Sequence, residues 1–522
     1  MNREEMINKL KPRQTPWDVL IIGGGASGLG AAVESASRGY DTLLLEQSDF
    51  AKGTSSRSTK LVHGGVRYLA QGNISLVMEA LRERGLLKQN APHLVRDQSF
   101  VIPCYSWWCV PFYTIGLTLY DLMAGKLGIG RSVPLSRKRT LQSLPAVRST
   151  GLRGGVRYFD CQFDDARLAV NLAQTTVDQG GVVVNYMKVG GLLKKEGRIT
   201  GVSAIDMETD ELYEISSRVV INATGVFVDQ VIKMDEPDAR DHVKPSQGIH
   251  LVMDRSFLRG EEALMIPKTS DGRVLFAVPW HNHVVVGTTD VEKKEAVLEP
   301  VADEVEVDYI LETAGRFMSE KPARGDVLSV FTGLRPLAAP SGEGKKTKEI
   351  SRGHKILVSP SGLVTLTGGK WTTYRKMGED VVNQAETTVG FSRRNSATRH
   401  LKIHGYVQEA DRSDPLYWYG SDRDQLQKLV HEDPELNELL SKELQIFKKQ
   451  VVHAVRYEMA RTVEDFLARR TRALQLNALE SVRLAPEIAS IMAAELGTDK
   501  NWEKQQVTQF TELAKNYRID SS

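Results

Sequence analysis

Three glycines near the start of the chain have the spacing of a nucleotide-binding turn. Gly23, Gly25 and Gly28 follow a buried, β-branched run at 19–22 and precede an alanine-rich segment at 29–37. The first glycine permits a tight turn, the second lets the backbone approach a pyrophosphate, and the third lets helix and strand pack closely. The N-terminus of the helix adds free N–H groups for phosphate oxygens. The pattern predicts a dinucleotide site.

An acidic residue and two later turns complete this prediction. Glu46 ends the next apolar run, 42–45, where an acid accepts hydrogen bonds from ribose hydroxyls. A strand at 219–222 leads into Ala223-Thr224-Gly225, and a strand at 363–367 leads into Gly368-Gly369-Lys370 and a helix. In two-domain flavoproteins a helix in that place directs its dipole at the flavin. The three features together favour FAD over NAD.

Composition excludes several classes of protein. The net charge is only +2 and 41% of the 522 residues are hydrophobic, which argues for a globular protein without a broad nucleic-acid surface. The cysteines number three, Cys104, Cys109 and Cys161, and this odd, sparse set without a CxxC motif indicates a reducing compartment. Residues 1–16 lack a secretory signal, and the chain lacks an apolar run long enough for a membrane span. We expect a cytoplasmic protein without a metal site; its oligomeric state stays open.

The order of elements predicts the fold class. Strands at 181–186 and 219–222 continue the first sheet, whereas 274–278 and 284–287 are typical of antiparallel strands in a second sheet. Residues 390–413 have the composition of a linker. Apolar residues beyond it recur at helical spacing on one face: Val451, Val452, Val455, Met459, Val463, Phe466 and Leu467.

We therefore predict an α/β, two-domain flavoprotein with an α-helical C-terminal domain at 393–522. The FAD-dependent region is residues 1–392. Its doubly wound FAD-binding domain comprises about 17–100, 155–235 and 354–392, and its antiparallel-sheet substrate domain comprises about 101–154 and 236–353.

Four longer motifs carry a family resemblance. They are Thr54–Tyr68 (TSSRSTKLVHGGVRY), Val286–Glu292 (VGTTDVE), Thr332–Leu337 (TGLRPL) and Gly368–Arg375 (GGKWTTYR). Together with Arg469-Arg-Thr-Arg472 in the tail, the chain resembles the FAD-dependent glycerol-3-phosphate dehydrogenases over nearly its whole length. The resemblance implies oxidation of glycerol 3-phosphate to dihydroxyacetone phosphate, hydride transfer to a noncovalently bound flavin, and electron transfer to a membrane quinone.

The resemblance also implies roles for individual residues. Arg67 and Arg335 are the candidate phosphate clamp, because a guanidinium binds phosphate oxygens bidentately. Lys370 is a candidate for phosphate or flavin, Tyr68 for the substrate, and His250 is the candidate base because histidine titrates near neutral pH. An ordinary surface arginine or lysine and a core histidine or tyrosine remain the alternatives. The remaining expected cofactor contacts are Ser55, Ser58, Lys60, His63, Gly64, Gly225, Gly369 and Thr372.

The segment 105–139 allows two interpretations. Its aromatic residues, which include Trp107 and Trp108, precede a basic cluster of Lys126, Arg131, Arg137, Lys138 and Arg139. Aromatic and basic residues in this arrangement are typical of a segment in the membrane interface, and the implied quinone favours peripheral contact with the inner face of the cell membrane. The alternative is a buried face or a subunit contact.

Rival functions also stay open. They are a glycerol-3-phosphate oxidase that uses O2, an amine- or amino-acid-oxidising flavoenzyme of the same fold, and a flavin-bound interaction module without enzymatic activity.

Overall fold

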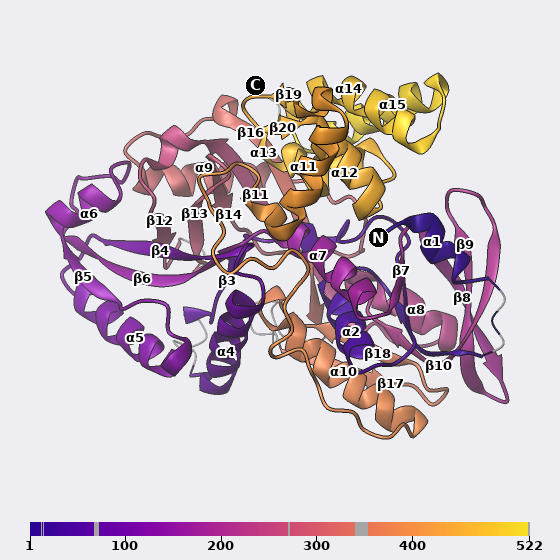
Figure 1. The fold of residues 1–522 in the computed structure, drawn as a ribbon. Helices are drawn as coiled ribbons and strands as arrows, with labels where there is room; N and C mark the ends of the chain where they lie inside the picture. Colours follow the sequence, from indigo (N-terminus) through magenta and orange to yellow (C-terminus); the bar gives the residue numbers. More distant parts are fainter. Residues whose placement is uncertain (12, 14, 67–71, 270–271, 340–352, 520–522) are drawn as a thin grey trace.

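The computed structural model describes residues 1–11, 13, 15–66, 72–269, 272–339 and 353–519. Its first sheet has the strand order β17-β18-β10-β1-β2-β7, and β18, β10, β1, β2 and β7 run parallel (Figure 1). A hairpin, β8-β9, extends β10. The bounds are β1 Trp17–Ile22, β2 Thr42–Leu45, β7 Val182–Val184, β8 Met187–Lys195, β9 Arg198–Asp206, β10 Leu212–Asn222, β17 His354–Val358 and β18 Val364–Gly368.

The second sheet is mostly antiparallel and has the order β15-β11-β14-β13-β12-β4-β6-β3, with β16 beside β11 and β5 beside β6. It lies beside the first sheet in Figure 1. The bounds are β3 Leu61–Val62, β4 Val95–Cys104, β5 Val133–Ser136, β6 Gly154–Phe163, β11 Val243–Asp254, β12 Ala263–Ile266, β13 Leu275–Trp280, β14 His283–Gly287, β15 Val291–Glu292 and β16 Val327–Ala338.

Helices cover these sheets. Those from the first part of the chain are α1 Arg3–Asn8, α2 Ala26–Ser37, α4 Ile74–Asn90, α5 Cys109–Ala124, α6 Arg137–Ser143, α7 Asp165–Asp178, α8 Val228–Asp235, α9 Glu304–Phe317 and α10 Tyr374–Val389. The predicted two-domain α/β flavoprotein fold with a helical tail is confirmed.

Helices α2 and α10 pack against each other at two glycines. A Cβ atom on Gly378 would lie 2.3 Å from the carbonyl oxygen of Gly30, and one on Gly30 would lie 2.6 Å from the carbonyl oxygen of Tyr374. The two backbones therefore touch without intervening side chains. Because α2 follows the nucleotide-binding turn and α10 follows Gly368-Gly369, this contact fixes the two predicted cofactor turns relative to each other.

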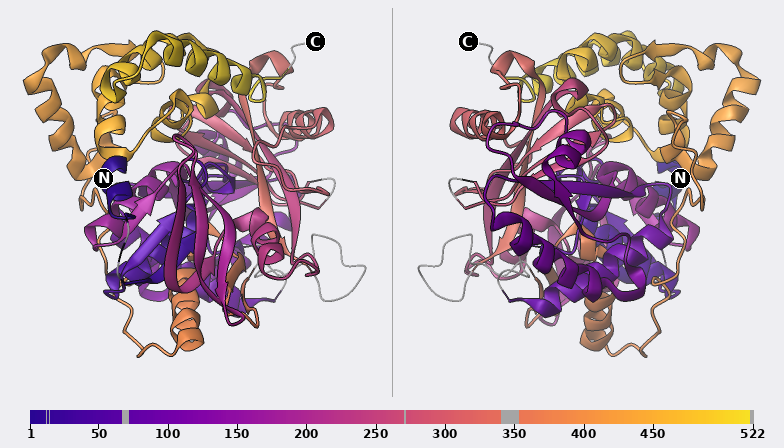
Figure 2. Two further views of the ribbon diagram at one scale, coloured as in Figure 1. Left: turned by 90° about the vertical axis from the view of Figure 1, so that its right-hand side faces the viewer. Right: turned by 90° about the vertical axis from the view of Figure 1, so that its left-hand side faces the viewer.

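The C-terminal helices lie over one end of both sheets (Figure 2). They are α11 Arg423–Glu432, α12 Lys448–Glu458, a π-helical turn η10 Asp465–Arg470, α13 Ala473–Leu476, α14 Ala478–Leu496 and α15 Lys500–Lys515, with a small hairpin, β19 Leu439–Ser441 and β20 Ile446–Phe447.

The apolar pattern in this domain does not form one helix. Helix α12 ends at Glu458, and the next residue, Met459, has a left-handed φ of 56°. Phe466 and Leu467 belong to η10. The pattern instead indicates which residues are buried: all of its members are buried except Val455, which is partly exposed. No helix in the described ranges is long and apolar enough to cross a bilayer.

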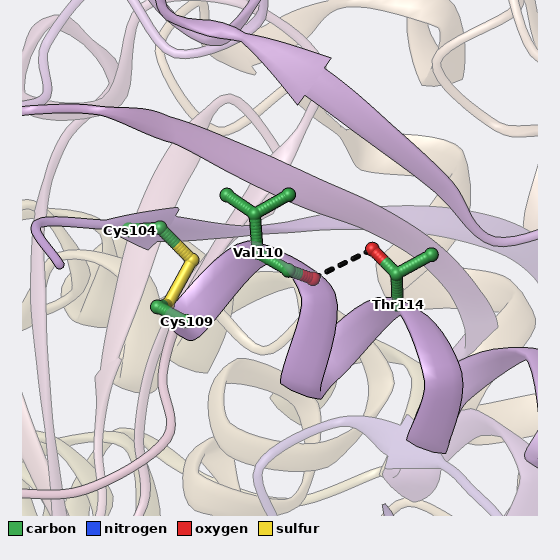
Figure 3. Close-up of a disulfide and its surroundings, with 4 residues drawn as sticks. All are labelled: Cys104, Cys109, Val110 and Thr114. Carbon is green, nitrogen blue, oxygen red and sulfur yellow. Dashed lines mark hydrogen bonds between the residues drawn. A yellow bond between two sulfur atoms is a disulfide. The ribbon is translucent and has the colours of Figure 1, made fainter. Parts of the chain in front are cut away.

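The cysteines differ from the expectation drawn from their number. Cys104, at the end of β4, and Cys109, at the start of α5, form a disulfide, and Cys161 remains free and buried (Figure 3). The odd count predicted thiols in a reducing compartment, but two of the three cysteines are close enough in space to pair. The disulfide fixes the start of α5 to the second sheet.

The contact between α2 and α10 makes a testable prediction. We expect Gly378→Ala to lower the melting temperature, because overpacking a rigid contact costs about 1–3 kcal/mol. Gly116→Ala in α5 is the matched control: its Cβ would meet no atom within 4 Å, and alanine favours a helix by about 0.5–1 kcal/mol over glycine. Equal melting curves for the two variants would contradict the backbone contact.

Candidate functional site

One cavity of about 470 Å³ extends between the two sheets. On one side it is lined by the carboxyl ends of β1, β2, β10 and β18, through Gly23, Glu46, Gly225 and Gly368. Open parallel sheets bind ligands at this edge. On the other side the lining comes from β4, β6, β11, β12, β13 and β16 of the second sheet. A ligand here would contact both sheets along its length.

The nucleotide-binding turn has the close contacts that its glycines predict. A Cβ on Gly28 would lie 1.8 Å from the carbonyl oxygen of Gly23, so a side chain there would push α2 off the turn. The N–H of Ala26, at the start of α2, donates to the hydroxyl of Ser55 at 2.9 Å. The carboxylate of Glu46 accepts from the backbone N–H of Gly24 at 2.6 Å. Burial raises the pKa of Glu46, although such N–H donors oppose the shift.

The second glycine turn is tied to the first. Gly368 and Gly369 have φ angles of 75° and 84°, a conformation that favours glycine. The indole N–H of Trp371 donates to the carbonyl oxygen of Ser55 at 2.7 Å, and the backbone N–H of His63 donates to the Thr372 hydroxyl at 3.3 Å. The turn therefore holds the 54–63 region from its cavity side.

His250 is a buried, cavity-lining residue of β11. Its Nε2 lies 2.8 Å from the Thr59 hydroxyl, and its ring stacks on Phe331 with 4.8 Å between centroids. Its Nδ1 makes no hydrogen bond to any residue that the structure describes. Burial, and then the positive charges of Arg335 and Lys60, hold the pKa of His250 well below its usual value. The imidazole is therefore neutral at pH 7.

Arg335 is fixed at the cavity wall by backbone and hydroxyl groups. Its Nη1 donates to the carbonyl oxygen of Thr289 at 3.0 Å and its Nη2 donates to the Thr288 hydroxyl at 3.1 Å. A Cβ on Gly248 would lie 2.3 Å from Nη2, so this glycine makes room for the guanidinium. Its Nη1 also lies 3.8 Å from the carboxylate of Asp290, which lines the cavity. An anionic ligand would therefore meet a positioned cation that is partly balanced by this carboxylate.

The structure places most of the predicted site residues around the cavity. Those that line it are His250, Arg335, Lys370, Gly23, Gly25, Glu46, Ser55, Ser58, His63, Gly225, Gly369 and Thr372. Gly28 and Gly64 lie behind the lining. Arg67 and Tyr68 lie outside the described residues. The roles of all these residues remain proposals.

Lys60 has a different place from the one predicted. Its ammonium is fully buried behind the cavity wall, where it donates to Asp165 at 2.8 Å, to the carbonyl oxygen of Ser56 at 2.6 Å and to Gln475 at 3.0 Å. The sequence motif suggests a ligand contact, but the lysine side chain turns toward the protein interior. It supports the turn that carries Ser58 and Thr59.

Sequence reasoning missed several lining residues. They are Arg57, Thr59, Asp160, Arg273, Thr288 and Phe276. Arg57 and Thr59 fall inside the quoted motif Thr54–Tyr68, and Thr288 inside Val286–Glu292, so the motifs held a signal that was not assigned to these positions. Asp160 and Arg273 come from other strands and turns of the second domain, where no local pattern marks them.

The residues present fit a long cofactor with phosphates and an aromatic ring system. The lining combines a helix N-terminus and an acid with a second glycine turn and Lys370. Phe100, Tyr158 and Phe276 supply apolar surface. The Cβ positions of Gly53 and Gly225 meet no protein atom within 4 Å, so the backbone is open to a ligand there. This donor set fits FAD.

Comparisons with known proteins agree with that fit. The family model described as "FAD dependent oxidoreductase" matches residues 18–375, and "C-terminal domain of alpha-glycerophosphate oxidase" matches residues 364–506. The chain is 36% identical to the mitochondrial glycerol-3-phosphate dehydrogenase of Bos taurus, over 99% of this chain and 75% of that protein. It is 33% identical to the Saccharomyces cerevisiae enzyme, over 98% and 91%.

A solved structure resembles the whole chain. The glycerol-3-phosphate dehydrogenase from Bacillus halodurans, complexed with FAD, has a TM-score of 0.81 at 29% identity and covers 99% of this chain and 98% of that one. The L-alpha-glycerophosphate oxidase from Mycoplasma pneumoniae, with a TM-score of 0.56 at 16% identity over 74% of this chain and 98% of that one, shares the fold.

The environment of His250 predicts how it titrates. We expect its Cε1 signal in the NMR spectrum of labelled protein to stay constant from pH 8 to pH 6, since the folded-state pKa is well below 6.5. His404 marks the chemical shift of a protonated imidazole over the same range: burial lowers its pKa, but hydrogen bonds and charges of Asp178 and Asp422 outweigh this and raise the pKa to about 9. His250→Asn assigns the signal. A midpoint near 6.5 for His250 would contradict the buried neutral imidazole.

Proposed function

The chain belongs to the FAD-dependent glycerol-3-phosphate dehydrogenases, and from that membership we propose that it oxidises sn-glycerol 3-phosphate to dihydroxyacetone phosphate and passes the electrons to a quinone. The observation that carries the proposal is the cavity between the two sheets, which combines a dinucleotide turn with a fixed arginine on the opposite wall. FAD, held noncovalently, supplies the acceptor for the hydride from C2.

Arg335 binds the substrate phosphate in this proposal. Carbonyl and hydroxyl groups already orient its guanidinium, so little conformational entropy is lost when a phosphate binds. Lys370 lines the same cavity and adds positive charge, and Arg67 completes the clamp. A cationic wall selects a phosphorylated alcohol over free glycerol.

His250 accepts the proton of the C2 hydroxyl in the same proposal. A general base must be unprotonated before the reaction, and the buried imidazole is neutral at pH 7. Thr59 holds one ring nitrogen and Phe331 holds the plane of the ring. The low pKa makes His250 a weak base. Proton transfer to it is therefore favourable only as the hydride leaves C2, because loss of the hydride makes the hydroxyl more acidic.

The proposed electron acceptor requires contact with a membrane, and α5 supplies a suitable surface. Its outer face and the preceding turn expose apolar side chains, of which Trp108 is 84% and Trp107 72% exposed; the others are Phe112, Ile115, Leu119 and Leu122. All five basic residues of the following cluster, from Lys126 to Arg139, are exposed as well. We propose that this surface lies peripherally on the inner face of the cell membrane, where quinone is dissolved.

Anaerobic flavin reduction tests the function and the clamp together. Glycerol 3-phosphate should bleach the yellow colour of the wild-type protein without air, and amino acids should not. Arg335→Met should raise the KM at least thirtyfold, because truncating one partner of a charge pair costs about 2 kcal/mol or more. Arg316→Met, an exposed arginine of α9, is the control and should behave as wild type.

Two outcomes would count against this assignment. An unchanged KM in Arg335→Met would remove Arg335 from the clamp. Bleaching by an amine or amino acid instead of glycerol 3-phosphate would replace the proposed substrate.

The membrane surface predicts salt-dependent binding to lipid. We expect the protein to co-sediment with anionic liposomes at low salt, because each basic residue near the surface contributes about 1 kcal/mol, and to dissociate as salt rises. Replacing Trp107, Trp108 and Phe112 by Ser should weaken binding at least tenfold. Val305→Ser, which changes an 80% exposed apolar residue elsewhere, should have no effect. Absence of binding, together with rapid peroxide formation in air, would favour O2 as the acceptor.

A further inference from the structure

Three arginines of the C-terminal domain are buried although the proposed chemistry does not use them. Arg469, Arg470 and Arg472 belong to the tail motif named in the sequence analysis, and each is at most 2% exposed. None of the three lines the cavity. Burying a guanidinium is costly unless it is fully paired, so the partners of these side chains indicate what they do. We refer to residues 464–475, which contain them, as the clamp segment.

The first partner of the clamp segment is Asp49, which lies in the FAD-binding domain. Arg470 binds its carboxylate with both Nη atoms, at 2.7 and 2.9 Å, and Arg469 donates to the same carboxylate through Nε. Asp49 is fully buried. It follows Glu46, the predicted ribose-binding acid, by one short turn. The bidentate contact neutralises the charge of the Asp49 carboxylate, and it also fixes the position of this turn.

Two further contacts lie along the same stretch of chain. Glu464 accepts from the ammonium of Lys52 at 2.6 Å. Gln475 donates to the carbonyl oxygen of Ser56 at 2.7 Å and accepts from Lys60 at 3.0 Å. The clamp segment thus contacts residues 49, 52 and 56 at intervals along one loop, and Lys60 just after that loop.

That loop lines the cavity with its other side. We call residues 46–58 the cofactor loop; its lining members include Glu46, Lys52, Thr54 and Ser55. Ser55 accepts from the first N–H of α2, so the loop is also joined to the nucleotide-binding turn. The cofactor loop is therefore held between the cavity and the C-terminal domain. Other segments contact its later part: Trp371 donates to the Ser55 carbonyl oxygen, and Arg57 pairs with Glu299.

We infer that the C-terminal domain retains FAD by fixing the cofactor loop, and that Arg470 and Gln475 are positioning residues for the cofactor. The inference rests on the FAD-dependent function proposed above and assigns a role to a domain that contributes no cavity-lining side chain among the described residues. Arg470 acts through Asp49 and Gln475 acts through the Ser56 carbonyl. Weakening either contact lets the loop move away from the nucleotide-binding turn and opens the cavity wall.

The experiment measures FAD release from the complete holoenzyme without substrate. Protein-bound flavin is diluted into FAD-free buffer, and the rise in flavin fluorescence gives the release rate. We expect Arg470→Lys, which keeps the charge but loses the bidentate contact, and Gln475→Met, which introduces no buried charge, to release FAD at least tenfold faster than wild type. With saturating FAD, the KM for glycerol 3-phosphate should stay within twofold of wild type. Arg483→Met, an exposed arginine of α14, is the control and should release FAD as wild type does.

Three results would overturn the inference. An unchanged release rate with a lowered melting temperature would show that the contacts only stabilise the fold. Unchanged release with a raised KM would place the effect on the substrate side. Equal acceleration in Arg483→Met would show a general effect of changing this domain. Because no substrate is present in the release measurement, absence of dehydrogenase activity would refute the proposed function and leave the measured release rates intact.

Discussion

The contact between α2 and α10 is the constraint on which the site depends. Neither Gly30 nor Gly378 can carry a side chain, because the backbone of the opposite helix fills the space. Helix α2 begins at the first glycine turn, and α10 follows the second after one short helical turn, Trp371–Thr373. With the helices in direct backbone contact, the two turns, which are separated by more than 300 residues in sequence, stay at a fixed distance from each other. A larger residue at the crossing would move the two helix N-termini apart and with them both ends of the cofactor site.

Electrostatics then divides the surroundings of the cavity into two layers. The inner layer presents cations and helix N-termini to the ligand, among them Arg335 and Lys370. The outer layer consists of buried ion pairs, such as Lys60 with Asp165 and Asp49 with Arg469 and Arg470. Burial alone would raise the pKa of Asp49, but the guanidinium groups of Arg470 and Arg469 lower it to about 2. Asp49 is therefore charged and paired with its two arginines. Within the inner layer, the carboxylate of Asp290 lies 3.8 Å from Nη1 of Arg335 and partly balances its charge.

Sequence reasoning predicted the features that depend on neighbouring residues. The glycine turn, Glu46 and the Gly368-Gly369 turn each follow from a strand, a turn and a helix within a few positions. It failed where distant segments decide the outcome. The Lys60 side chain points into the protein interior, where its ammonium binds Asp165 and Gln475. Asp160 and Arg273 reach the cavity from strands and turns that no motif connects. The pairing of Cys104 with Cys109 depends on where α5 starts relative to β4. The chain leaves the helical path at Met459, and η10 then brings Arg469 and Arg470 to Asp49.

Helix α5 lies between the proposed membrane surface and the cavity, and its width sets the distance between them. Its outer face exposes the apolar residues of the proposed membrane surface, while Tyr120 on its inner face accepts a hydrogen bond from the N–H of Gly64 at 2.8 Å and donates to Asp160 at 2.9 Å. Asp160 lines the cavity, and Gly64 adjoins the lining residues His63 and Gly65. A helix with its side chains is about 10 Å across. In the proposed arrangement, about one helix diameter therefore separates the membrane surface from Asp160 at the cavity wall.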